Sequence, residues 1–162
     1  MRVGEFTVIS PRNAMKDIFM ESICGHITQI DDRISFSSLD INKNLAIHFY
    51  GIKIDLKDNN ISWDLLTPKI LGHIFLFNWE DEGTLKTIEK MLDHLAGIST
   101  TPIMVIANVN GNNDLPIPEK FVEPNGFALE PTVRFTYCQL SDSKCTKRAV
   151  SGIVNILMER LP

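Results

Sequence analysis

The segment Val8-Ile9-Ser10-Pro11-Arg12-Asn13-Ala14-Met15-Lys16-Asp17 decides the fold, because it is where a strand passes into a helix. The apolar residues of Glu5–Ile9 before it predict a strand. Apolar residues at helical spacing after it predict an amphipathic helix over Ala14–Cys24, which Gly25 ends. Its expected buried residues are Met15, Ile18, Phe19 and Ile23. Strand, short turn and helix in this order begin an α/β domain.

Strands and helices alternate along the rest of the chain. Five further strands are predicted, at Arg33–Ile41, Leu45–Tyr50, Ile74–Phe77, Ile103–Ile106 and Val133–Cys138. Further helices are expected near Trp63–Leu66, from a cap at Thr84 to Gly97, and from Ser143 onward. The short link Asn42-Lys43-Asn44 makes the second and third strands an antiparallel hairpin. The order predicts an α/β, doubly wound, Rossmann-like three-layer fold whose six-stranded sheet is mainly parallel, with one antiparallel edge strand.

Composition places the chain among ordinary globular proteins. Its 162 residues predict a single domain, 1–162. A net charge of −4 and a pI near 5.5 argue against a nucleic-acid-binding role. Neither a signal peptide nor an apolar run of about 20 residues is found in the sequence, so we expect a cytoplasmic protein with no membrane span. The three cysteines form no C-x-x-C pair: Cys138 is predicted to be core, and Cys24 and Cys145 are predicted to be unreactive.

The turn after the first strand stands where a phosphate-binding loop, G-x-x-x-x-G-K-[ST], would stand. Ser10 and Met15 occupy the two glycine positions, Lys16 keeps the lysine, and Asp17 replaces the Ser/Thr that would bind Mg²⁺. Lys16 therefore has two interpretations, a residual phosphate ligand or, as we favour, an exposed lysine in the first turn of a helix. Arg12 is a second candidate anion ligand beside the same helix N-terminus. The scattered aspartates and histidines predict no metal site.

Three later stretches also carry the comparison; the first and third stand at motif positions with altered residues, and the second keeps the pattern Trp-Asp-hydrophobic-Leu. They are Phe49-Tyr50-Gly51-Ile52-Lys53-Ile54-Asp55, Trp63-Asp64-Leu65-Leu66 and Asn108-Val109-Asn110-Gly111. In order, spacing and apolar pattern the chain resembles the small Ras-like GTPases, above all the bacterial gliding or polarity (Mgl-type) GTPases. The resemblance extends over almost the whole chain and implies a P-loop small-GTPase-like fold.

The altered residues remove most of the chemistry that the resemblance would bring. Ile54 stands at the glycine that contacts the γ-phosphate, and Asp55 at the glutamine that orients water in many members of that family. Gly111 replaces the aspartate that reads guanine, which leaves Asn108 as the residual base-site residue. The resemblance with these departures implies a pseudo-GTPase that holds no cofactor and acts as a protein-interaction or scaffolding module.

The resemblance also implies a partner of the roadblock/longin kind at the surface equivalent to the switch regions. The candidate partner-binding residues are Gly51, Lys53, Asp55, Trp63, Leu66 and, on the edge strand, Ser37. Trp63 is open to two interpretations, a core residue or an interface residue. The edge strand is a further candidate, because an open edge accepts a partner strand. Self-association also remains open.

Two other functions are left as alternatives. The first is a divergent GTP-binding protein with weak GTPase activity, which would use GTP or GDP with Mg²⁺ and Lys16. The second is another doubly wound regulatory domain, of the receiver or flavodoxin type. Ser10-Pro11-Arg12 supplies neither the acidic pair that a receiver needs after its first strand nor the glycine-rich loop that a flavin needs. The pseudo-GTPase is therefore the favoured hypothesis.

Overall fold

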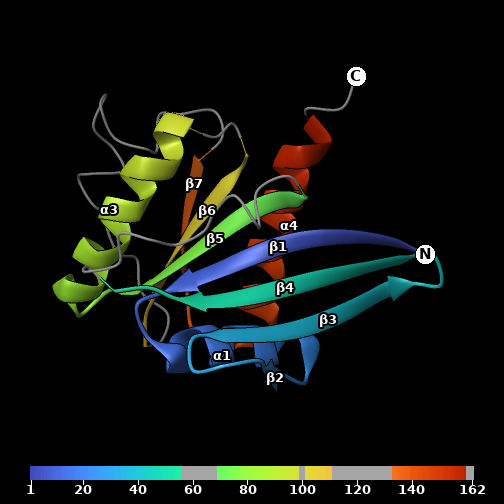
Figure 1. The fold of residues 1–162 in the computed structure, drawn as a ribbon, viewed down its shortest axis with the longest axis horizontal. Helices are drawn as coiled ribbons and strands as arrows, with labels where there is room; N and C mark the ends of the chain where they lie inside the picture. The colour runs from blue at the N-terminus through green and yellow to red at the C-terminus, as the bar shows by residue number, and fades with distance from the viewer. Residues whose placement is uncertain (56–68, 99–100, 111–132, 160–162) are drawn as a thin grey trace.

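A computed structural model of the chain describes residues 1–55, 69–98, 101–110 and 133–159. One mixed sheet of seven strands runs through this part of the molecule, with α1 and α4 on one face and α3 on the other (Figure 1). The α/β class and the mainly parallel sheet are thus confirmed. The helix predicted near Trp63–Leu66 lies outside the described residues.

The sheet has the strand order β2-β3-β4-β1-β5-β6-β7. Its strands are β1 (Arg2–Ser10), β2 (Thr28–Gln29), β3 (Ile34–Asn42), β4 (Leu45–Lys53), β5 (Ile70–Asn78), β6 (Ile103–Asn108) and β7 (Val133–Cys138). Five of them, from β4 through β1 to β7, pair in parallel. The hairpin of β3 and β4 is antiparallel, as its short turn predicts.

The predicted count of six strands is one too few. The two-residue strand β2 pairs antiparallel with Ser35 and Phe36, so the first part of β3 is not at the edge of the sheet. Thr28 and Gln29 lie in a polar segment without apolar alternation, and two residues are too few for a pattern to reveal. Beyond Phe36, the described residues provide β3 with a strand partner on one side only, which is β4.

Helix α1 (Asn13–Cys24) begins one residue before the predicted start and ends at Gly25, which has the left-handed φ of 78° expected of a glycine cap. Its buried face differs from the prediction, because Ile18 is 45% exposed whereas Lys16 and Met20 are buried. The inward stripe consists of residues spaced by four along two adjacent rows, Met15-Phe19-Ile23 and Lys16-Met20. Ile18 lies outside both rows.

Helix α3 (Glu82–Ile98) starts before its predicted cap, Thr84, and runs one residue past Gly97. Asp81 caps it instead, because the Asp81 carboxylate accepts the backbone N–H of Gly83 at 3.0 Å. The Thr84 hydroxyl turns back toward β5, where it accepts the backbone N–H of Asn78 at 2.9 Å. Helix α4 (Ser143–Glu159) begins at the predicted residue.

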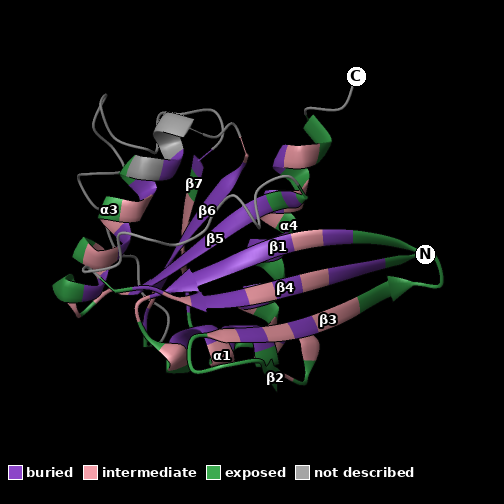
Figure 2. Cartoon of the chain, in the orientation of Figure 1, coloured by how far each residue is buried: buried purple, intermediate pink, exposed green. Residues whose placement is uncertain are grey.

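Two hydrophobic cores lie on opposite faces of the sheet (Figure 2). The core under α1 and α4 includes Phe6, Phe19 and Phe49, and the core under α3 includes Phe75 and Phe77. Strands β1, β5 and β6 are covered on both faces, which explains why their sequences are almost continuously apolar. No helix in the described ranges has the length and apolar character needed to cross a membrane.

Candidate functional site

The strand order defines a switch point at the carboxyl end of β1. The chain leaves β1 for α1 on one face and leaves β5 for α3 on the other, and ligands of doubly wound folds bind in the crevice between such loops. The two loops here are Ser10–Arg12 and Asn78–Asp81. The side chains of Arg12 and Asp81 form an ion pair that joins them. This pair closes one loop onto the other at the position where a ligand would enter.

The first loop is a compact turn rather than a glycine-rich cradle. The Ser10 hydroxyl accepts the backbone N–H of Arg12 at 3.2 Å and donates to the Arg12 carbonyl at 2.8 Å. The Ser10 carbonyl accepts the N–H of Ile54 at 2.9 Å, so the loop is also tied to the end of β4. The hydroxyl and carbonyl groups of Ser10 are therefore used within the protein. No side chain caps α1 at Arg12.

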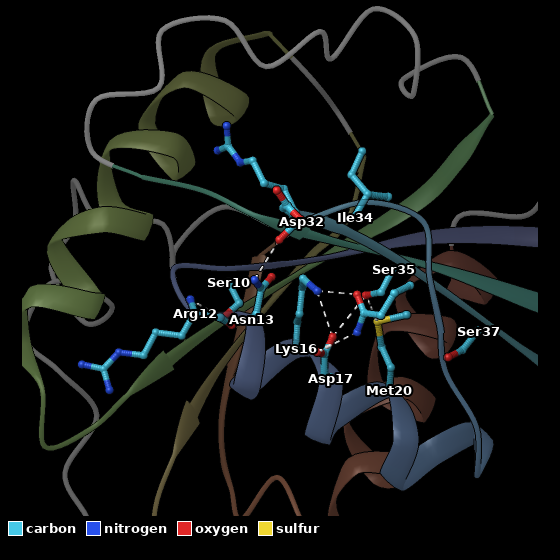
Figure 3. Close-up of polar contacts among 12 residues, drawn as sticks. Ser10, Arg12, Asn13, Lys16, Asp17, Met20, Asp32, Ile34, Ser35 and Ser37 are labelled. Carbon is cyan, nitrogen blue, oxygen red and sulfur yellow. Dashed lines mark hydrogen bonds and ion pairs between the residues drawn. The ribbon is translucent and has the colours of Figure 1, made fainter.

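Lys16 is fully buried, and the prediction that it is an exposed lysine is wrong. Its ammonium donates to the Asp17 carboxylate at 2.8 Å and to the Ser35 hydroxyl at 3.0 Å, between α1 and β3 (Figure 3). Arg12 extends in a different direction from the same end of the helix. Burial of a charge is costly unless it is paired and hydrogen-bonded, and Lys16 meets both conditions.

Gly51 on β4 makes room for the stem of Lys16. A Cβ at Gly51 would stand 2.5 Å from the Ser35 hydroxyl, 2.6 Å from the Met20 sulfur and 3.1 Å from Cδ of Lys16. These distances are shorter than ordinary van der Waals contact, so a Cβ at Gly51 would force Ser35, Met20 or α1 to shift. Sequence reasoning missed Ser35 as the partner of Lys16. The sequence feature that could have indicated this partner is the alternation of Ser35 and Ser37, which places both side chains on one face of the strand.

The Asn108 side chain closes the last strand–helix connection. Its Oδ1 accepts the backbone N–H of Leu140 at 3.1 Å, and its carbonyl accepts the N–H of Trp79 at 3.0 Å. Asn108 thus joins the ends of β5, β6 and β7 from within the fold. The remainder of the predicted base-reading stretch, from residue 111, lies outside the described residues.

The predicted partner-binding residues that the structure describes do not share one exposed surface. Gly51 and Ser37 are buried on the α1 side of the sheet, where the Ser37 hydroxyl donates to the His26 carbonyl at 2.7 Å. Lys53 is half-buried and Asp55 is exposed at the end of the hairpin. Trp63 and Leu66 lie outside the described residues.

Three apolar residues that stand at or beside the altered motif positions, Met15, Ile52 and Ile54, are all buried. Ile52 and Ile54 belong to the core under α3, whereas Met15 belongs to the core under α1 and α4. The sheet separates the two groups. They therefore fill two cores and do not share a single cavity.

The three candidate nucleotide ligands, Arg12, Lys16 and Asn108, thus each contact other groups of the protein. Within the described ranges, no group of three or more His, Cys, Asp or Glu side chains is placed to hold a metal ion. No protein-family model matches the chain, and no curated protein matches it in sequence.

Proposed function

We propose that the protein is a pseudo-GTPase-like domain that binds a protein partner instead of a nucleotide. The buried ammonium of Lys16 carries the proposal. A phosphate-binding lysine must reach the phosphates, but Lys16 donates to Asp17 and Ser35 beneath the helix. Releasing it would leave the Asp17 carboxylate and the Ser35 hydroxyl without their cation, which opposes phosphate binding.

The ion pair of Arg12 and Asp81 supports the same conclusion. Arg12 is the other cation near the start of α1, and its guanidinium is bonded to a carboxylate from the facing loop. An incoming phosphate would have to displace this carboxylate and would meet its negative charge at close range. The Asn108 amide, which could have contacted a base, is bonded to Leu140. All three residual nucleotide ligands are thus bonded to other groups of the protein.

An apolar groove beside the hairpin supports a partner-binding role. It has a volume of about 380 Å³ and lies between α1, the hairpin and α4. Ile41 and Leu45 line it and are 49% and 36% exposed, next to the part of β3 that lies beyond β2. Exposed apolar side chains beside a strand edge are typical of protein-binding surfaces. The resemblance to Mgl-type GTPases makes a roadblock/longin-type protein the partner to test.

Calorimetric titration of the nucleotide-free protein with Mg²⁺–GTP, Mg²⁺–GDP and Mg²⁺–ATP tests the nucleotide half of the proposal. We expect no heat of binding at millimolar ligand from a protein whose circular dichroism shows it to be folded. Micromolar binding of any of the three would overturn the proposal. In that case Lys16→Met, which keeps the buried volume and removes the charge, would lose the binding only if Lys16 contacts the phosphates.

Titration with purified roadblock/longin-domain proteins tests the partner half. We expect Ile41→Asp to weaken binding at least about tenfold, since it places a charge in the groove. The matched control is Ile18→Asp, because Ile18 is similarly exposed but lies on the outer side of α1. Equal binding by both variants would remove the groove from the proposal. Absence of binding to every such protein would contradict this class of partner.

A further inference from the structure

Two cysteines that are separated in the sequence meet at the carboxyl edge of the sheet. Cys138 is the last residue of β7, and Cys145 is the third residue of α4. Cys145 packs against the core cluster that contains Cys138. The Cys145 sulfur also lies 3.7 Å from the carbonyl oxygen of Tyr137, and the Cys138 sulfur lies 3.7 Å from that of Gln139. Both sulfurs thus lie against the carbonyl groups on either side of Cys138, so the Cys145 thiol is held close to Cys138.

The two thiols differ in access to solvent. Cys138 is 1% exposed, whereas Cys145 is half-buried. Burial and the neighbouring Cys145 raise the pKa of the Cys138 thiol above its usual range, so Cys138 is protonated at neutral pH. A dissolved oxidant therefore meets Cys145 first. The third cysteine, Cys24, is at the end of α1, and burial raises the pKa of its thiol to about 11.

We propose that Cys138 and Cys145 form a dithiol site that hydrogen peroxide oxidises to an intramolecular disulfide. The Cys145 sulfur attacks one peroxide oxygen, the O–O bond breaks, and the departing hydroxide takes up a proton to leave as water. Cys145 is then a sulfenic acid. The Cys138 sulfur attacks the Cys145 sulfur, the S–O bond breaks, and the proton of Cys138 leaves with the hydroxide as a second water. Both thiols are oxidised and the peroxide is reduced.

The disulfide would restrain the connection between β7 and α4. That connection contains Leu140, whose backbone N–H is bonded to the Asn108 side chain, and Asp142, whose carboxylate accepts the N–H of Lys144. A covalent link across it fixes the first turn of α4 to the end of β7. The site is independent of the proposed partner binding, because the groove is lined by later residues of α4, from Lys147 to Asn155.

Treatment of the folded protein with hydrogen peroxide tests the proposal, with Cys24→Ser as the background for all variants. We expect the intact mass to fall by that of two hydrogen atoms, with loss of both free thiols and full recovery on reduction. Cys138→Ser should instead stop at the sulfenic acid, which dimedone traps on Cys145. Cys145→Ser should react more slowly than Cys138→Ser, since its remaining thiol is buried.

Three outcomes would overturn the proposal. They are overoxidation of Cys145 without disulfide formation in the Cys24→Ser protein, disulfide formation only after unfolding in denaturant, and equal oxidation rates in the two single-serine variants. Circular dichroism of each variant before treatment shows whether it is folded. If Cys138→Ser does not fold, because it places a hydroxyl in the core, Cys138→Ala gives the same trapping experiment with an apolar replacement.

Discussion

The ammonium of Lys16 lies 3.0 Å from the hydroxyl of Ser35, across the contact between α1 and β3. The Ser35 hydroxyl in turn lies 3.3 Å from the Asp17 carboxylate, which also accepts from Gln29 at 3.0 Å. One cation thus connects the first turns of α1 with two strands at the edge of the sheet. In this position Lys16 is a structural residue, and its substitution should change stability.

Lys16→Ala should lower the free energy of unfolding by about 3 kcal/mol, because it leaves a cavity and removes the cation from Asp17. Lys16→Met fills the same space without a charge, and Asp17, whose side chain is 25% exposed, keeps its hydrogen bonds from Gln29 and Ser35. The methionine variant should therefore lose less than about 1.5 kcal/mol. Chemical denaturation of both variants measures the difference. An alanine variant as stable as the native protein would contradict the buried position of Lys16.

Gly51→Ala should destabilise the protein by about 1–3 kcal/mol, because its Cβ would overlap Ser35 and Met20 and push α1 from the sheet. The matched control is Gly4→Ala on β1. Its Cβ would approach only Cδ1 of Leu71, at 3.2 Å, and Leu71 is 44% exposed and can turn aside. Thermal melting of the two variants should separate them clearly. Equal melting temperatures would show that α1 is not packed on Gly51 as described.

Acid should destabilise the fold through His73, which is buried beside Thr7, with its Nδ1 2.6 Å from the Thr7 hydroxyl oxygen. Desolvation lowers the pKa of His73 from 6.5 to about 4, so the unfolded chain binds this proton more readily. The contribution of His73 to the free energy of unfolding is fully present above pH 6.5. As the pH falls toward 4, that free energy decreases by about 3 kcal/mol.

Denaturant titrations between pH 7 and 4 measure the slope of stability against pH. His73→Gln should make this slope shallower, and His26→Gln, at an exposed histidine, is the matched control. The same slope in all three proteins would exclude His73 as the source.

Asp81 contributes to stability in two ways, through its ion pair with Arg12 and as the cap of α3, and substitutions can separate the two. The ion pair is partly exposed, with side-chain exposures of 56% and 34%, so it should contribute less than about 1 kcal/mol. Asp81 also caps α3 through the Gly83 N–H, which contributes about 1 kcal/mol more. Asp81→Ala should therefore be more destabilising than Arg12→Ala in urea denaturation. Asp81→Asn should recover the cap without the charge, and equal losses in all three variants would contradict the capping role.

Sequence pattern was sufficient for most of the fold. The six longer strands and the three described helices appear where the apolar periodicity places them, because each must bury one stripe or both faces. The pattern was insufficient for β2, whose two residues carry no periodicity. It also assigned the α3 cap to Thr84, since Asp81 and Thr84 are both good capping residues and only their backbone positions distinguish them.

The candidate site depended far more on contacts between distant segments. The order of residues around Ser10–Asp17 was enough to predict a strand, a turn and a helix, and to show that a phosphate loop there lacks its glycines. The burial of Lys16 was not predictable, because it requires a glycine 35 positions away on β4 and a serine on β3 to come under the same turn of α1. Local propensity acts over a few neighbouring residues, whereas the partner of a buried charge is set by how helices and strands pack. Chain order therefore sufficed for the architecture, and the packing of α1 on the hairpin settled what its lysine contacts.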